Sequence, residues 1–378
     1  MTMLPDFRLE TYLSKWEFSA RYHMTASDME TFSLGELLEM AEPADRDAWQ
    51  SLPLGYIETY GTPPLRETIA GTYDALKPAD ILCFAGAEEG IFAAMHALLE
   101  KDDHAIILTP NYQSAETLPL TICKTDGVAL DETHGWVLDL DDIKRKLTPK
   151  TKLIYVNFPH NPTGKVIDHG SFASLIALCR QHGIYLLSDE VYRGLERDPS
   201  IRLPQAADLY ERALSLNVMS KAYGLPGLRI GWIACRDHAV LSRMERIKHY
   251  LSICNAAPSE HLAIIALKAR AKILARNHEL ITENLKAMNT FFDEFSHLFD
   301  WSVPDGGCIA FPRYKGKDGV ETFCRRLAEE DGIVLLPSSI YASALGKTPA
   351  DRFRIGFGRS HTIEGLSAMR AHLRRNHP

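Results

Sequence analysis

The sequence lacks an excess of basic residues. Its 378 residues include 42 lysines and arginines against 49 aspartates and glutamates, so the formal net charge is -7. Domains that bind nucleic acids usually present a basic face. The charge balance therefore argues against a nucleic-acid partner, and the basic pair Arg374-Arg375 is better explained as solvated helix surface.

Cysteine pairs at metal-binding spacing are also absent. The seven cysteines are scattered along the chain, and no two of them form a Cys-x-x-Cys pair. An odd number of cysteines without that spacing suggests neither a disulfide framework nor a zinc site. We therefore expect no bound metal and interpret most of the cysteines as small core residues of a protein in a reducing compartment.

No apolar run approaches the length that a membrane-spanning helix needs. Residues 1–6 show no basic segment followed by an apolar stretch, which argues against a signal peptide. Hydrophobic residues make up 46% of the chain and charged residues 24%, as is usual in globular proteins. We expect a cytoplasmic protein that makes no membrane contact.

Short apolar runs alternate with helical patterns through the middle of the chain. The runs lie at residues 81–84, 105–108, 153–156, 184–187, 213–216 and 230–234. Continuous apolar strands separated by helices predict an α/β fold whose central sheet is mostly parallel and covered by helices on both faces. We expect a large domain over residues 49–289 and a smaller α+β domain built from residues 1–48 and 290–378.

Residues that can bind a ligand or take part in catalysis follow these strands, at the edge where open α/β sheets bind ligands. They are Gly86, Tyr112, Asn157, Asn161, Asp189, Tyr192 and Lys221. An amine placed like that of Lys221 can form an imine with an aldehyde if its pKa is lowered. An isolated lysine is more often solvated at a strand end. The residues around Lys221 are therefore needed to distinguish a reactive lysine from a surface lysine.

Residues 220–232 read Ser-Lys-Ala-Tyr-Gly-Leu-Pro-Gly-Leu-Arg-Ile-Gly-Trp. This string closely resembles the cofactor-lysine signature of class I and II aminotransferases, which are fold-type I enzymes dependent on pyridoxal 5'-phosphate (PLP). The resemblance implies that Lys221 holds PLP as a Schiff base and that Arg229 binds its phosphate. Most members carry a serine or threonine where this chain has Val218, and Ser220 could partly replace that contact.

Further landmarks of the same family precede the lysine. Asp189 resembles the aspartate that pairs with the pyridine nitrogen, and Tyr192 the tyrosine that bonds to the ring hydroxyl. Residues 158–164 are similar to the family motif Asn-Pro-x-Asn-Pro-Thr-Gly, in which Asn161 would share that hydroxyl. Without the resemblance, an acidic pair after a strand is usually a helix cap, and the prolines and Gly164 would indicate only a turn.

The phosphate of the cofactor is expected at Gly86, Ala87 and Glu88. Glycine allows the backbone to approach, and the helix that follows offers free N–H groups at its positive dipole end. We expect the N–H of Glu88, and not its side chain, to face the phosphate. Tyr112 matches the aromatic residue that stacks on the cofactor ring, although alone it would be interpreted as a core or rim tyrosine.

Tyr56 lies five residues before Gly61, at the spacing that the family shows before Gly-x-Pro-x-Leu-Arg. In the family this tyrosine reaches the phosphate in the neighbouring subunit, so the resemblance implies a homodimer; Tyr60 is a nearby competitor for the role. Arg354, together with Asn161, is expected to bind the substrate. A guanidinium can grip an α-carboxylate with two parallel hydrogen bonds, and Arg352 is an alternative for this role.

Two functions follow from the resemblance. The first is an aminotransferase that moves an amino group between an amino acid and a 2-oxo acid, with Lys221 as general base. Within the family, residues 156–162, 220–229 and 306–313 are similar to capreomycidine synthase-like proteins, which implies as the alternative a PLP-dependent lyase or cyclase acting on an arginine-like amino acid. A non-catalytic binding domain on the same fold is a weaker third hypothesis, because no basic segment precedes the fold.

Overall fold

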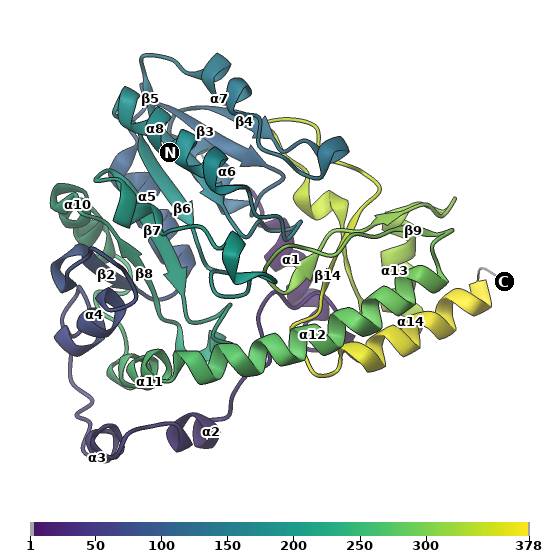
Figure 1. Cartoon of the computed structure of the whole chain (residues 1–378), viewed down its shortest axis with the longest axis horizontal. Helices are drawn as coiled ribbons and strands as arrows, with labels where there is room; N and C mark the ends of the chain where they lie inside the picture. Colours follow the sequence, from purple (N-terminus) through teal and green to yellow (C-terminus); the bar gives the residue numbers. More distant parts are fainter. Residues whose placement is uncertain (1–3, 377–378) are drawn as a thin grey trace.

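The computed structural model describes residues 4–376 and contains a seven-stranded sheet at its centre (Figure 1). The strands stand in the order β2-β8-β7-β6-β5-β3-β4. Their bounds are β2 Ile81–Phe84, β3 His104–Thr109, β4 Lys124–Ala129, β5 Thr151–Asn157, β6 Tyr185–Asp189, β7 Ala213–Val218 and β8 Gly231–Ala234. The strands from β4 to β7 are parallel, which confirms the predicted α/β fold with a mostly parallel sheet.

Strand β8 is the exception, because it runs antiparallel to both of its neighbours. Its first residue, Gly231, pairs with Phe84 at the end of β2 and with Val218 at the end of β7. The chain therefore enters β8 at the same edge of the sheet at which β2 and β7 end. This edge is where the polar residues predicted from the sequence gather.

Helices cover both faces of the sheet, as the uninterrupted apolar strands predict. Along β5, Leu153 and Tyr155 pack into one core cluster and Ile154 and Val156 into the other, because successive side chains of a strand point to opposite faces. The first cluster includes apolar residues of α5 (Ala87–Leu98) and α10 (His238–Lys248). The second includes residues of α7 (Leu140–Lys146) and α8 (His169–His182).

The C-terminal third of the chain builds three small sheets. Their pairs are β1 (Tyr22–His23) with β12 (Ile333–Val334), β14 (Phe353–Gly356) with β10 (Ile309–Ala310) and β13 (Leu336–Pro337), and β9 (Phe299–Asp300) with β11 (Arg313–Tyr314). The pairing of β1 with β12 brings the N-terminal segment to the C-terminal part of the chain. The division into two domains stays a prediction, since the expected boundary at residue 289 falls inside the continuous helix α12 (Arg270–Glu294).

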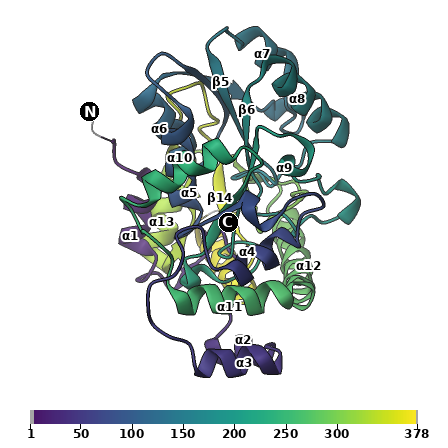
Figure 2. The same ribbon diagram turned by 90° about the vertical axis from the view of Figure 1, so that its left-hand side faces the viewer.

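The remaining helices lie around these sheets. They are α1 (Arg8–Trp16), α2 (Leu34–Glu39), α3 (Pro43–Gln50), α4 (Pro63–Ala70), α6 (Ser114–Ile122), α9 (Ala206–Leu209), α11 (Ala257–Lys268), α13 (Val320–Asp331) and α14 (Thr362–Asn376). Both views show α2 and α3 at the periphery beside α11, which they contact (Figure 2). None of the helices within residues 4–376 has the length and apolar character needed to cross a membrane.

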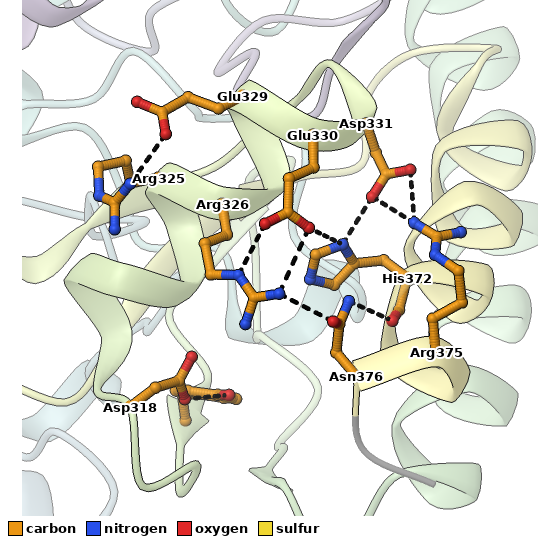
Figure 3. Close-up of polar contacts among 10 residues, drawn as sticks. Asp318, Arg325, Arg326, Glu329, Glu330, Asp331, His372, Arg375 and Asn376 are labelled. Atoms are coloured by element: carbon orange, nitrogen blue, oxygen red, sulfur yellow. Dashed lines mark hydrogen bonds and ion pairs between the residues drawn. The ribbon is translucent and has the colours of Figure 1, made fainter.

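An ion-pair network joins α13 to α14 (Figure 3). The side chain of His372 is almost fully buried, and its Nδ1 lies 2.6 Å from a carboxylate oxygen of Asp331. Asp331 also accepts a hydrogen bond from Arg375 at 2.7 Å, and Glu330 pairs with Arg326 at 2.8 Å. Although these acids and the histidine are close enough to share a cation, each carboxylate already has a basic partner. We therefore interpret the cluster as a link between the two helices.

Candidate active site

A cavity of about 560 Å³ opens at the edge of the sheet where β2, β5, β6 and β7 end. Its walls come from the loops after these strands, from the N-terminal segment 7–28 and from residues 354–359. The cavity brings together ten of the residues predicted from the sequence. They are Ala87, Glu88, Tyr112, Asn161, Asp189, Tyr192, Ser220, Lys221, Arg229 and Arg354.

Lys221 lies three residues beyond the end of β7, and its side chain faces the cavity. Its Nζ donates a hydrogen bond to Oγ of Ser27 at 2.8 Å. Burial lowers the pKa of the Lys221 ammonium group, Asp28 opposes this effect and Arg354 adds to it. The lowered pKa increases the fraction of neutral amine, which is the form that attacks an aldehyde or accepts a proton.

Asp189 is the last residue of β6, and its carboxylate is buried at the floor of the cavity. The hydroxyl of Tyr155 donates to its Oδ2 at 2.7 Å, and the N–H of Val191 donates to its Oδ1 at 3.2 Å. Burial is the main cause that raises the pKa of Asp189 to about 6. A buried acid held by two donors in this way is suited to pair with a protonated ring nitrogen.

Tyr192 and Asn161 face the same cavity from neighbouring loops. The hydroxyl of Tyr192 is buried and no described residue meets it in full hydrogen-bond geometry, although the side chain of Ser27 lies close enough to oppose the rise in its pKa that burial causes. Asn161 is held by its own N–H, which donates to Oδ1 of Asn157 at 2.7 Å, and its Oδ1 accepts from the hydroxyl of Tyr341 at 3.1 Å. The turn 158–164 therefore aims the Asn161 amide into the site, as both interpretations of the motif allowed.

Gly86 precedes α5 with a φ of +97°, a conformation that favours glycine. A Cβ at this position would collide with the guanidinium of Arg229, whose Nη2 lies 3.4 Å from the carbonyl oxygen of Ala85. The first N–H groups of α5 and this guanidinium together form a cradle for an anion. Val218 lines the same cavity without a polar group, whereas Ser220 offers a hydroxyl.

Glu88 belongs to the first turn of α5 and lines the cavity. Its Oε2 accepts a hydrogen bond from Oγ of Ser114 at 3.0 Å, so this oxygen is directed toward α6. Burial raises the pKa of the Glu88 carboxyl group to about 7. A carboxyl group that is only about half ionised near pH 7 repels a bound phosphate less than a fully ionised one would.

Arg354 is the arginine that reaches the cavity from β14. It is 1% exposed, and its Nη1 donates to the hydroxyl of Tyr341 at 2.8 Å while its Nη2 donates to the carbonyl of Thr25 at 2.9 Å. Arg352, the alternative, is engaged elsewhere, since its Nη2 donates to Oε1 of Glu132 at 2.7 Å. The geometry therefore favours Arg354 over Arg352 as the site for a substrate carboxylate.

Two predicted tyrosines differ in their placement. Tyr112 lines the cavity, and its ring centroid lies 5.3 Å from that of Phe7. Tyr56 is 92% exposed and does not line the cavity of its own chain. Tyr60, its competitor, is half-buried against the core. A role for Tyr56 in the site of a second copy stays a prediction.

The N-terminal segment supplies cavity residues that the sequence reasoning missed, namely Glu10, Glu17, His23, Thr25, Ser27 and Asp28. Asp28 pairs with Arg359, another unpredicted residue, at 2.7 Å. Burial, aided by Arg354, lowers the pKa of His23 to about 4, so the imidazole is neutral near pH 7. No motif in this segment signals its place, because the pairing of β1 with β12 and backbone contacts with distant residues such as Gly356 and Gly358 bring it to the cavity.

The cavity fits the cofactor that the sequence resemblance implies. The buried hydroxyl of Tyr192 is placed to meet the ring hydroxyl of PLP, and the buried acid Asp189 suits its ring nitrogen. The glycine-lined cradle at Gly86 and Arg229 suits its phosphate, and the amine of Lys221 suits its aldehyde.

The affinity of the cofactor-free chain for PLP should fall below about pH 6. The raised pKa of Asp189 means that this acid is neutral below that pH and then offers no charge to a protonated ring nitrogen. We expect a loss of up to about tenfold per pH unit, measured as the dissociation constant in absorbance titrations. Asp189→Asn is the matched control, since it should bind weakly throughout and show no such step; equal affinity above and below pH 6 in the unmodified chain would contradict the assignment.

The profile of the family described as aminotransferase class I and II matches residues 35–371. Capreomycidine synthase of Streptomyces vinaceus is 29% identical over 375 residues, which cover 98% of this chain and 94% of that protein. A probable N-succinyldiaminopimelate aminotransferase of Mycobacterium tuberculosis is 27% identical over 300 residues, or 74% of this chain and 73% of its own.

Solved structures agree over the whole chain. A PLP-dependent aminotransferase from Streptococcus suis superposes with a TM-score of 0.91 at 29% identity and covers 99% of both chains. The PLP-dependent cyclase OrfR superposes with a TM-score of 0.89 at 21% identity, over 100% of this chain and 99% of that one. The second likeness shows the fold alone.

Proposed function

Since the chain belongs to the PLP-dependent family of class I and II aminotransferases, we propose that it moves an amino group between an amino acid and a 2-oxo acid. The observation that carries this proposal is the convergence of Lys221, Asp189 and Arg354 on one cavity. A reactive amine, a ring-pairing acid and a carboxylate-binding guanidinium are the three groups that such a reaction needs side by side.

When bound, PLP supplies an electron-withdrawing ring that stabilises negative charge at the substrate Cα. Asp189 would keep a proton on the ring nitrogen, and Tyr192 and Asn161 would bond to the ring hydroxyl. The N–H groups of Ala87 and Glu88 bind the phosphate. Arg229 and Ser220 complete this cradle, and Tyr112 covers the ring.

Arg354 orients the substrate by two parallel hydrogen bonds to its α-carboxylate. The bonds of the guanidinium to Tyr341 and Thr25 fix its plane before the substrate arrives. Lys221 would hold the cofactor aldehyde in the resting enzyme and, as a free amine, would be the base that takes the proton from the substrate Cα onto Nζ.

An amino-transfer assay tests this function. The loaded enzyme is incubated with each protein amino acid together with pyruvate or 2-oxoglutarate, and the newly formed amino acid and 2-oxo acid are measured. Appearance of both products in equal amounts supports transamination. A colourless protein that does not bind added PLP, or a loaded enzyme that transfers no amino group, contradicts the proposal.

A second candidate is a PLP-dependent lyase or cyclase that acts on an arginine-like amino acid. It is favoured by the acidic wall of the cavity, where Glu10 of α1 and Glu17, the residue after α1, have no ion-pair partner among the described residues. Burial, with Glu10 and Asp28 nearby, raises the pKa of Glu17. A cationic side chain would relieve this repulsion. Release of ammonia or of a cyclic product, with no new amino acid, distinguishes this candidate from the first.

We also propose that two copies of the chain form a homodimer with shared sites. Leu54, Tyr56 and Tyr250 are 84%, 92% and 92% exposed, which is unusual for large apolar side chains in a monomer. A partner copy that covers them could receive Tyr56 at the phosphate end of its own cavity, in line with the family spacing.

Mixing two inactive variants should restore activity if the sites are shared. Tyr56→Ala keeps its own Lys221, and Lys221→Ala keeps its own Tyr56, so each mixed dimer would contain one complete site. An equal mixture refolded together should reach about a quarter of the unmodified activity, because half of the dimers are mixed and one of their two sites is complete. Activity that stays at the sum of the separate variants would contradict a shared site.

A further inference from the structure

Residues 26–30 pass directly in front of the reactive lysine and are packed closely on three glycines. A Cβ at Gly356 would collide with the carbonyl oxygen of Ala26, and one at Gly358 would lie 2.5 Å from that of Asp28. A Cβ at Gly224, in the loop that begins with Lys221, would lie 2.6 Å from the carbonyl of Glu30. Such close backbone approach leaves this segment little freedom to move away from the lysine.

The segment presents one hydroxyl to the lysine. Within residues 4–376, Oγ of Ser27 is the only hydrogen-bond partner of the Lys221 Nζ, at 2.8 Å. The two residues are 194 positions apart in the sequence, so the contact depends on tertiary packing alone. The N–H of Met29 also donates to the carbonyl of Lys221 at 3.4 Å, which joins the segment to the backbone of the same residue.

The charged and titratable groups that face Lys221 do not replace this contact. They are Asp28, Arg354, Cys308, Asp189 and Glu17. The carboxylate of Asp28 is bonded to Arg359 and that of Asp189 to Tyr155, and none of these groups makes a hydrogen bond to Nζ within the described residues. Arg354 repels the ammonium. The neutral hydroxyl of Ser27 is thus the group that orients the amine of Lys221.

We propose that Ser27 is a positioning residue that holds the amine of Lys221, once the substrate has displaced it, with its lone pair toward the substrate Cα. This inference rests on the proposed function, in which Lys221 is the base. An amine at the end of four rotatable bonds has many orientations, and one hydrogen bond to a fixed acceptor removes most of them. The same role serves transamination and elimination, because both begin by removing the Cα proton.

Exchange of the Cα hydrogen reports this step without knowledge of the final product. The loaded enzyme is placed in heavy water with a mixture of the twenty protein amino acids, and loss of each Cα signal is followed by NMR. Ser27→Ala should slow the exchange about 10- to 100-fold, and Ser27→Thr, which keeps the hydroxyl, should restore most of the rate. Ser14→Ala, on the exposed side of α1, should exchange like the unmodified enzyme.

A second measurement needs neither turnover nor cofactor. Reductive methylation of the cofactor-free chain with formaldehyde, read at Lys221 by peptide mass spectrometry, follows the neutral amine as a function of pH. Because Ser27 accepts a hydrogen bond from the ammonium form, its loss should move the midpoint to lower pH by about one unit. Ser27→Thr and Ser14→Ala should leave the midpoint in place.

The outcomes distinguish the role of Ser27 from the proposed function of the enzyme. Normal exchange together with an unchanged midpoint in Ser27→Ala would overturn the role of Ser27 while leaving the proposed function intact. A purely structural role would lower the melting temperature of Ser27→Ala without moving the midpoint, and would also overturn it. If the unmodified enzyme exchanges no amino acid, the proposed function fails first, and the positioning role fails with it.

Discussion

Replacing Lys221 by alanine should abolish turnover and remove the visible absorbance that PLP acquires on joining the lysine. The variant loses both the amine that carries the cofactor and the base that moves the Cα proton. We expect a loss of at least about 10⁴-fold in kcat, measured with whichever amino acid the unmodified enzyme uses fastest. Bound PLP should still be retained by the cradle at Gly86 and Arg229.

Two variants control this result. Lys221→Arg keeps a positive charge, yet it should be as inactive as the alanine variant, because a guanidinium stays protonated and is no base at neutral pH. Lys101→Ala removes an exposed lysine between α5 and β3 and should leave the rate unchanged. Residual turnover of a tenth or more in Lys221→Ala would mean that another group removes the proton, and would exclude the mechanism.

Replacing Arg354 by lysine should lower kcat/KM for amino acids by about 10- to 100-fold and leave PLP absorbance unchanged. The charge is retained, but the planar pair of donors held by Tyr341 and Thr25 is lost. One charge-assisted hydrogen bond contributes about 1.5–3 kcal/mol, which corresponds to the expected factor. Steady-state kinetics over a range of substrate concentrations measures the effect.

The alternative arginine supplies the matched comparison. Arg352→Lys loses its bonds to Glu132 and should affect stability but not kcat/KM. A substrate analogue in which hydrogen replaces the α-carboxylate should react slowly and equally with the unmodified enzyme and Arg354→Lys. If Arg352→Lys shows the larger loss in kcat/KM, the assignment of the carboxylate site is wrong.

The central sheet could be predicted because its strands are buried on both faces. The apolar runs at 81–84, 105–108, 153–156, 184–187, 213–216 and 230–234 each coincide with a strand to within two residues. Strand β4 was not predicted, because Lys124–Ala129 is polar and only partly buried at the edge of the sheet. A strand with a neighbour on one side only buries fewer of its side chains, so its hydrophobic pattern is too weak to predict it.

The residues of the candidate site also divide into those that the sequence could predict and those that it could not. Lys221, Asp189 and Asn161 stand in local motifs near strand ends, and the resemblance of these motifs to a known family implied their roles. Ser27 and Glu17 reach the cavity through the pairing of β1 with β12, two short strands more than 300 residues apart. A two-residue pairing leaves no periodic pattern, and the register that turns Ser27 toward the lysine depends on close contacts with glycines far away in the chain.

The reversed direction of β8 has a consequence for what insertions the chain can accept. Lys221 and Arg229 belong to a single hairpin loop, so the proposed attachment point and the proposed phosphate clamp are spaced by the length of that loop. Had β8 run parallel to β7, the clamp would stand at the opposite end of the sheet. One residue added or removed between 222 and 228 would therefore shift Lys221 relative to Arg229 without altering either side chain.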